Sequence, residues 1–219
     1  KKAKLLAQAI VQIGKQSKVK TTAVLTNMDN PLGVNIGNSL EVIETIEALM
    51  GKGPEDLMKV TIALAAQMLR LANIRGSIRM LKHKITSGQA LDKFRQIIES
   101  QGGDPRVIED CKRLPVAKKS VKVIAQKTGY IHDLDTYALG MLLVMLGGGR
   151  LRKEDNIDPS CGFKIHKKIG DHASKGESLA EVFSNNVRRA NAARADVQNM
   201  YTIKRDKPRR RTLIRETIS

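Results

Sequence analysis

The sequence predicts a chain in two parts, an α/β segment followed by an α+β segment. Apolar residues recur at helical spacing through most of residues 1–105, whereas short runs of alternating apolar and polar residues prevail over 119–219. The spacing of the apolar residues changes around Pro115, so we place a linker at 106–118. With 219 residues, 41% of them apolar, the chain is large enough to bury a core in one domain or two.

The first part is predicted to be mostly helical and to open with a helix over residues 2–14 that Gly14 ends. Apolar side chains gather on one side of this helix, and we expect this side to stay uncovered in the isolated chain: Leu5, Leu6, Ala9, Ile10 and Ile13. A strand is expected over 20–26. Further helices are predicted over 38–50, 55–72, 77–85 and 90–100.

The second part is predicted to combine short strands with two helices. The helix over 133–146 is apolar nearly all round and should be deeply buried until Gly147-Gly148-Gly149 ends it. The helix over 185–200 should lie on the surface with one apolar side facing inward. Strands are expected over 121–125, 129–131, 163–165 and 179–183. Two closing strands, 202–203 and 212–218, are predicted to pair with each other.

Both parts are organised around the stretch 25–49, in which a strand leads through a turn-rich loop into a helix. Asn38 is predicted to cap this helix, because Glu41 follows at the spacing of a capping box. On a helical wheel, Glu44 and Glu47 lie beside the apolar stripe rather than on the opposite, polar side. A carboxylate next to an apolar stripe needs a partner, so we expect each of them to have one.

The same stretch carries a resemblance to a known family. TNMDNPLGVNIGNSLEVIE is similar to the T-D-M-x-x-P-L-G-x-x-x-G-N-x-L-E-V-x-E segment of the pyrimidine-nucleoside phosphorylases, which include thymidine phosphorylase. Further matching segments follow in family order: Ser87-Gly88, Gln101-Gly102-Gly103-Asp104, Leu146-Gly147-Gly148-Gly149-Arg150 and Lys167-Lys168-Ile169-Gly170-Asp171. The resemblance covers nearly the whole chain and corresponds to the C-terminal half of the family's polypeptide. It implies the second half of the family's mixed-sheet α/β domain, followed by the C-terminal α+β domain.

The resemblance places the catalytic residues outside this chain. In the family, the phosphate-binding loop and the Arg, Ser and Lys that hold the pyrimidine lie upstream of the region matched here, and this sequence has no K-H-S-T-G-G stretch. We therefore assign no catalytic residue. The first residue, Lys1, is not a methionine, which predicts a fragment or a processed product.

The resemblance does imply a metal site. Family members bind a monovalent cation, usually potassium, that braces the phosphate loop. The matching ligands are the backbone carbonyls of Leu32 and Asn35 and the carboxylate of Glu44. Oxygen ligands suit a hard cation, and loop carbonyls without a strand partner are free to supply them. The alternative interpretation of Glu44 is a salt-bridged carboxylate at the edge of the core.

Two functions from different classes remain open. The first is an enzyme, a pentosyltransferase that uses phosphate to split uridine or thymidine into free base and pentose 1-phosphate. It would need the missing N-terminal half, on this polypeptide or on a partner chain, and we expect a cytoplasmic homodimer. The second is a non-catalytic basic protein derived from this fold and recruited to a ribonucleoprotein, such as a mitochondrial ribosome, where it would contact RNA.

Composition bears on the choice of partners. The net charge of +17 attracts polyanions, and the densest cluster of positive charge is Lys204–Arg211. Aromatic residues make up 3% of the chain and Trp is absent, so platforms for stacking bases are not expected. The two cysteines make no disulfide framework, which favours a reducing compartment. The longest apolar run, 141–146, is too short to span a bilayer, so we expect no membrane partner.

Other candidate chemistry is weak. Cys161 has no obvious base beside it and is predicted to be a buried small residue. The Gly147-Gly148-Gly149 run is predicted to end a helix, whereas a phosphate cradle should open one. Four histidines are scattered without the spacing of a metal site: His83, His132, His166 and His172.

Overall fold

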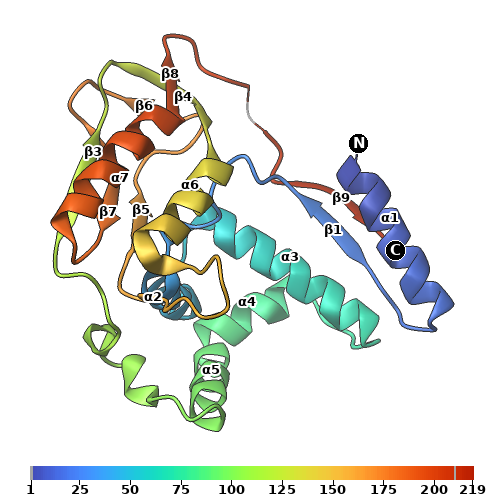
Figure 1. Cartoon of the computed structure of the whole chain (residues 1–219). Helices are drawn as coiled ribbons and strands as arrows, with labels where there is room; N and C mark the ends of the chain where they lie inside the picture. The colour runs from blue at the N-terminus through green and yellow to red at the C-terminus, as the bar shows by residue number, and fades with distance from the viewer. Residues whose placement is uncertain (1, 210) are drawn as a thin grey trace.

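The computed structural model describes residues 2–209 and 211–219 and places a helical first part beside a β-rich second part (Figure 1). The helices of the first part are α1 (Lys2–Gln16), α2 (Asn38–Leu49), α3 (Glu55–Leu71), α4 (Ile78–Thr86) and α5 (Gln89–Ser100). Its strands are β1 (Ala23–Thr26) and β2 (Asn35–Ile36). Two short 3-10 turns, η1 (Pro105–Val107) and η2 (Cys111–Arg113), lead out of it.

The second part holds the remaining strands and two helices. Its strands are β3 (Ser120–Ile124), β4 (Gly129–Leu134), β5 (Gly162–Ile165), β6 (His172–Ala173), β7 (Ser178–Phe183), β8 (Tyr201–Lys204) and β9 (Ile214–Ile218). Its helices are α6 (Thr136–Leu143), which continues as the π-helical turn η3 (Val144–Gly148), and α7 (Val187–Met200). This mixture of helices and antiparallel sheets agrees with the predicted class, α/β plus α+β.

Antiparallel sheets connect the two parts. One sheet has the strand order β2-β5-β7-β3, another has the order β6-β4-β8, and β1 forms a two-stranded ribbon with β9. Both β1 and β2 come from residues 1–105, yet each pairs with a strand from 119–219. The division into domains at 106–118 stays a prediction, but the sheets join the sequence on either side of it.

The main hydrophobic core lies in the second part, where the sheets pack against α6 and α7. Its fully buried side chains include Val123, Ile131, Leu139, Phe163 and Val197. The helices of the first part contribute much less. Among the residues that the structure describes, Ala7 is the one buried residue of α1, and α4 and α5 have none.

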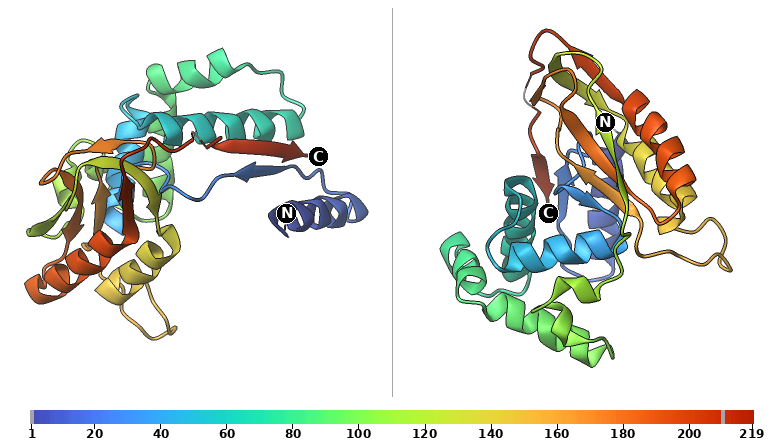
Figure 2. Two further views of the ribbon diagram at one scale, coloured as in Figure 1. Left: turned by 90° about the horizontal axis from the view of Figure 1, so that it is seen from above. Right: turned by 90° about the vertical axis from the view of Figure 1, so that its left-hand side faces the viewer.

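The apolar side of α1 is uncovered, as expected. Leu5, Leu6 and Ile13 are 61%, 63% and 61% exposed, and the helix turns Ala7 toward the β1–β9 ribbon instead. Figure 2 shows α1 and α3 on opposite sides of this ribbon. Gly14 does not end the helix, which runs on to Gln16; an ideal Cβ at Gly14 would lie 2.0 Å from Thr21 Oγ1. Close packing of α1 against Thr21 therefore explains the glycine at position 14. The side of α1 that contacts the ribbon is formed by small residues such as Ala7.

The helix predicted over 133–146 begins later than expected. Its predicted deep burial is wrong: Leu139 and Leu142 are buried, whereas Met145 in the following turn is 63% exposed. Residues 129–134 continue as β4, and the Asp135 side chain then accepts a hydrogen bond from the Ala138 N–H, which caps α6. At its other end, the prediction for the glycine run is confirmed. Gly147 has a φ of 110°, a left-handed conformation that favours glycine, and the helix stops at Gly148.

The predicted pairing of the two closing strands with each other is wrong. β8 pairs with β4 beside Tyr130, whereas β9 pairs with β1, where Ala23 lies opposite Ile218. Two contacts hold the segment before β9 against the loop that follows β1. The Asn27 N–H donates to the Leu213 carbonyl at 2.7 Å, and the Arg211 guanidinium lies 2.6 Å from Asp29. Because of these long-range contacts, the segment before β9 lies against the loop after β1 and not beside β8.

We predict that the exposed apolar side of α1 drives association of the purified chain. Replacing Leu6 and Ile13 together with Glu should lower its tendency to form concentration-dependent oligomers, because contiguous apolar surface favours association. Analytical ultracentrifugation over a range of chain concentrations measures this. The control is Gln8→Glu with Gln12→Glu, which adds the same charge to the same helix without removing apolar surface. A wild-type chain that stays monomeric at every concentration contradicts the prediction.

Candidate functional site

The loop between β1 and α2 is fixed by the side chain of Glu44, which is 4% exposed. Glu44 Oε1 accepts hydrogen bonds from the N–H groups of Val34 at 2.8 Å and Asn35 at 3.2 Å. An ideal Cβ at Gly33 would lie 2.0 Å from Glu44 Oε2, and Gly33 has a φ of 71°. A side chain larger than a hydrogen atom at position 33 would therefore push the carboxylate out of its place.

The electrostatic balance at Glu44 is set by burial. Burial raises the pKa of Glu44, because the charged form loses its contact with water; the two N–H donors and the charge of Lys168 oppose this rise. Lys168 itself pairs with Asp56 on α3 rather than with Glu44. No Lys or Arg of the described residues forms an ion pair with Glu44. Its partners are backbone amides, which differs from a salt-bridged carboxylate at the core edge.

Several oxygen atoms near Glu44 could hold a cation. Within the described part of the chain, neither Glu44 Oε2 nor the Leu32 carbonyl accepts a hydrogen bond. The Ile165 N–H donates to the Val34 carbonyl at 2.7 Å, so alternation along the antiparallel pair turns the Asn35 carbonyl away from β5. The side-chain oxygen of Asn35 is buried without a hydrogen-bond partner. An unpartnered buried oxygen and a free carboxylate oxygen fit a hard cation.

The structure thus brings Asn35 and Glu44 together, whereas Leu32 lies exposed in the loop just before them. The side-chain amide of Asn35 was not expected to take part. Its Nδ2 donates to the Leu40 carbonyl at 3.2 Å, and this bond holds the amide in place with its oxygen left over. An asparagine inside a short strand next to a buried carboxylate is the sequence signal that could have indicated it.

The predicted capping box at the start of α2 is half right. Glu41 does reach back, since its Oε1 accepts a hydrogen bond from the Gly37 N–H at 3.1 Å. Asn38, however, does not cap; Gly37 occupies the cap position, and Asn38 Nδ2 donates to the Gly148 carbonyl at 3.0 Å. The asparagine therefore connects α2 to the second part. Glu47, which was expected to share the environment of Glu44, lies exposed.

The remaining candidates form no second centre. The described residues contain no cluster of three His, Cys, Asp or Glu side chains that could hold a metal ion. His132 lies beside Asp206 and His166 beside Glu181, at 3.4 and 3.3 Å. Cys161 is buried, as predicted, and its burial raises the pKa of the thiol to about 11, so it is not a ready nucleophile.

The glycine run after α6 offers carbonyl groups rather than amides. The Gly147 carbonyl accepts from the Asp158 N–H at 2.8 Å, and the Gly148 carbonyl accepts from Asn38. A phosphate cradle needs N–H donors directed at the anion. The structure therefore agrees with a helix-ending turn.

The basic tail is partly engaged in structural contacts. Arg211 pairs with Asp29 and approaches Asp133 at 4.0 Å, and Lys207 Nζ lies 5.9 Å from the centre of the Tyr130 ring. Arg210, which belongs to the predicted cluster, lies outside the described residues. Among the helices of the described chain, none combines the length and the apolar character needed to cross a bilayer.

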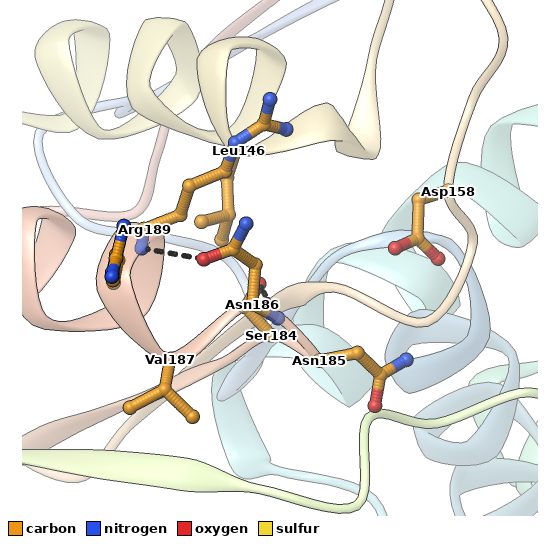
Figure 3. Close-up of a pocket in the computed structure, with 8 residues that line it drawn as sticks. Leu146, Asp158, Ser184, Asn185, Asn186, Val187 and Arg189 are labelled. Atoms are coloured by element: carbon orange, nitrogen blue, oxygen red, sulfur yellow. Dashed lines mark hydrogen bonds between the residues drawn. The ribbon is translucent and has the colours of Figure 1, made fainter.

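A hollow that the sequence did not predict lies elsewhere on the molecule. A cavity of about 670 Å³ opens where the end of η3, the loop at Asp158 and the start of α7 meet (Figure 3). Leu146, Asp158, Arg188 and Arg189 are among its lining residues. The cavity is built by three separate segments, at Leu146, at Asp158 and at 184–189, so no local motif could have indicated it.

Two comparisons place the chain among known proteins. Residues 130–204 match the family model described as the pyrimidine nucleoside phosphorylase C-terminal domain. Proteins named pyrimidine-nucleoside phosphorylase from Staphylococcus aureus strains USA300 and NCTC 8325 are each 43% identical over 187 residues, which is 84% of this chain and 43% of each relative. A third, from the bovine strain RF122/ET3-1, matches to the same extent. The chain spans less than half the length of these relatives.

We predict that Glu44→Gln makes the stability of the fold less dependent on pH. Because the pKa of Glu44 is raised in the folded state, its contribution to stability is fully present below the unfolded pKa and is lost as the pH rises through the folded pKa. Glutamine mimics the protonated form. Urea unfolding should therefore show that the free energy of unfolding of the variant rises relative to that of the wild type between pH 4 and pH 8.

The measurement uses a buffer whose only cation is tetramethylammonium, so that no small cation compensates the carboxylate. Glu47→Gln is the matched control, because Glu47 is exposed on the same helix and should change stability by less than about 0.5 kcal/mol at any pH. If both variants follow the wild type across the pH range, the buried charge of Glu44 does not matter to the fold.

Proposed function

We propose that this chain, which belongs to the pyrimidine-nucleoside phosphorylase family, supplies the C-terminal portion of a pyrimidine-nucleoside phosphorylase and acts when an N-terminal half completes it. In the reaction, a phosphate oxygen bonds to the anomeric carbon of the nucleoside as the bond to the pyrimidine breaks. The products are the free base and pentose 1-phosphate. Such chemistry depends on positioning and electrostatic stabilisation.

The observation that carries the proposal is the bond pattern at Glu44. The carboxylate fixes the backbone of Val34 and Asn35 with one oxygen and leaves the other beside the loop. This is the segment in which the resemblance is densest, and the chain is 43% identical to relatives of that name. The residues here supply a scaffold for the reacting groups, and we assign no catalytic residue among them.

Potassium is the cation that we propose for this site. Glu44 Oε2 and the carbonyl oxygens of Leu32 and Asn35 would hold it. When bound, the cation supplies a positive charge beside the phosphate-binding loop. Its charge would also offset the unfavourable burial of the Glu44 carboxylate, which explains why a buried acid without an ion-pair partner stands here.

The N-terminal half is the partner that the open surfaces of the first part fit. β1 and β9 form a sheet of two strands, so each has an edge without a described partner strand. The apolar side of α1 flanks this ribbon. A further strand and helices docked here, from this polypeptide or another, would cover both. We propose a homodimer of the completed protein in the cytoplasm, a setting in keeping with two free cysteines.

The ribonucleoprotein function is the second candidate, with a mitochondrial location. The net charge of +17 supports it. The tail supports it less than expected, because Arg211 is held by Asp29 and Asp133. The phosphorylase portion is therefore the function that we favour.

We predict that the 219 residues alone release no uracil or thymine from uridine or thymidine in the presence of phosphate. Mixing or co-expressing the chain with the N-terminal half of the Staphylococcus aureus relative should restore phosphate-dependent release, because the two halves together supply the active site. Chromatography of base and pentose 1-phosphate measures it. Each half alone is the control, and activity of the chain by itself would show that the assignment of the missing residues is wrong.

We predict that potassium stabilises the chain through Glu44. Potassium at ten times its Kd should add about 1.4 kcal/mol to the free energy of unfolding. Glu44→Gln should abolish this gain, since it removes the formal negative charge from the ligands, and Glu47→Gln should keep it. Thermal unfolding in potassium and in tetramethylammonium measures the effect without any activity. Equal responses of the two variants would remove the metal assignment while leaving the family unaffected.

A further inference from the structure

The cavity beside α7 has exposed cations on one side and a carboxylate on the other. Arg188 and Arg189 come from the first turn of α7, and Asp158 comes from the loop across the cavity (Figure 3). The Asn186 side chain accepts a hydrogen bond from the Arg189 N–H at 3.1 Å, so the end of the helix is already capped. The charge available to a ligand is therefore that of the side chains.

Two more cations extend this rim. The Lys118 N–H donates to Asn185 Oδ1 at 3.2 Å, and the Ser184 N–H donates to the Lys119 carbonyl at 3.3 Å. These bonds hold the segment 118–119 directly beside the residues that lead into α7. We call the set Lys118, Lys119, Arg188 and Arg189 the cationic rim.

The cationic rim is free of acidic partners. All four residues are exposed. None of their charged nitrogen atoms lies within 4.0 Å of a carboxylate oxygen in residues 2–209 and 211–219. In the tail, by contrast, Arg211 is paired. Positive charge on this rim is thus more available than at the end of the predicted cluster.

The backbone beneath the rim is held by a chain of hydrogen bonds. The Asn186 N–H donates to Ser184 Oγ at 3.2 Å, and Asn185 Nδ2 donates to Ser160 Oγ at 3.2 Å. Ser160 Oγ in turn donates to Asp158 Oδ1 at 2.6 Å. Ser160 and Ser184 are buried. The two walls of the cavity are therefore connected to each other, and the rim is presented on ordered backbone.

We propose that the cationic rim binds the phosphodiester backbone of a nucleic acid. Arginine and lysine side chains neutralise phosphates, and arginine does so with a planar fork that matches the phosphate oxygens. The four cations come from two segments that meet at Asn185, and the Asp158 carboxylate repels a small anion that enters the cavity. A polymer with successive phosphates fits such an arrangement better than one phosphate group.

The ligand is bound by its backbone rather than by its bases. The lining of the cavity has no aromatic side chain on which a base could stack. Binding should therefore depend strongly on salt and weakly on sequence. This inference does not rest on the proposed phosphorolysis, because it concerns a different surface and is measured without substrate.

The test is a salt titration of the full chain with a fluorescent RNA hairpin, followed by anisotropy, and with the DNA hairpin of the same sequence. Arg188→Gln together with Arg189→Gln should weaken binding about tenfold near physiological salt. The slope of log K against log salt should fall by about two, because each phosphate contact contributes about 0.9. If the variant loses affinity for both hairpins, the ligand is the phosphodiester backbone that RNA and DNA share. If it loses affinity for the RNA hairpin alone, the ligand is RNA.

Two further variants fix the sign of the effect. Asp158→Asn removes the negative charge opposite the rim and should strengthen binding, while its amide oxygen still accepts from Ser160. The matched control is Arg75→Gln with Arg79→Gln, which removes two exposed cations outside both the cavity and the Lys204–Arg211 cluster and should change the affinity much less. Thermal unfolding confirms that each variant is folded.

Three results would overturn the proposal. The first is wild-type binding to both hairpins that is no tighter than micromolar, the affinity of nonspecific contacts. The control pair could lower the slope as much as the rim pair does, which would make the attraction a property of the net charge. Inorganic phosphate at millimolar concentration could displace the RNA fully at constant ionic strength, which would make the cavity a site for a small anion.

Discussion

The hydrogen bonds that Glu44 accepts from Val34 and Asn35 are the constraint on which the rest of the structure depends. They hold the end of the loop against α2 and so present β2 to β5. Two further bonds then secure α2 to the second part, from Asn38 to the Gly148 carbonyl and from the Ser39 N–H to the Pro159 carbonyl. A local contact within one stretch thereby sets how the helical part is attached to the sheet.

The hydrogen bonds of this attachment are accepted by the buried carboxylate of Glu44, although an uncharged acceptor could accept them equally well. Backbone amides satisfy one oxygen of the carboxylate, but burial still disfavours its charged form. The ion pair of Lys168 with Asp56 connects α3 to the second part; the charge of Lys168 lowers the pKa of Glu44, whereas that of Asp56 raises it. A fold that needed the acceptor alone could have a glutamine here. The presence of a carboxylate at position 44 is therefore the physical reason to regard it as part of a cation-binding site rather than as a purely structural contact.

Prediction from the sequence succeeded where local chemistry decides and failed where distant segments decide. The expected bounds of α3, α5 and β7 are close to those observed, because apolar periodicity, Pro54 and the glycine turns are local signals. The deep burial expected of α6 was wrong, since an apolar pattern does not say what covers each side of a helix. The helical wheel placed Glu44 and Glu47 alike beside the apolar stripe, and only the family resemblance singled out Glu44. The cavity beside α7 could not be predicted, because contacts between separate segments build it.

The β1–β9 ribbon has a consequence for the order in which the chain folds. Its two strands stand almost the whole sequence apart, with Ala23 opposite Ile218. Closing so long a loop is entropically unfavourable, and strand pairs of high sequence separation form slowly. During synthesis, β1 emerges long before β9 exists, so its edge stays open while the second part assembles around its own core. Formation of the ribbon is then a late step of folding, and until then the open edge of β1 is available to chaperones and to wrong partners.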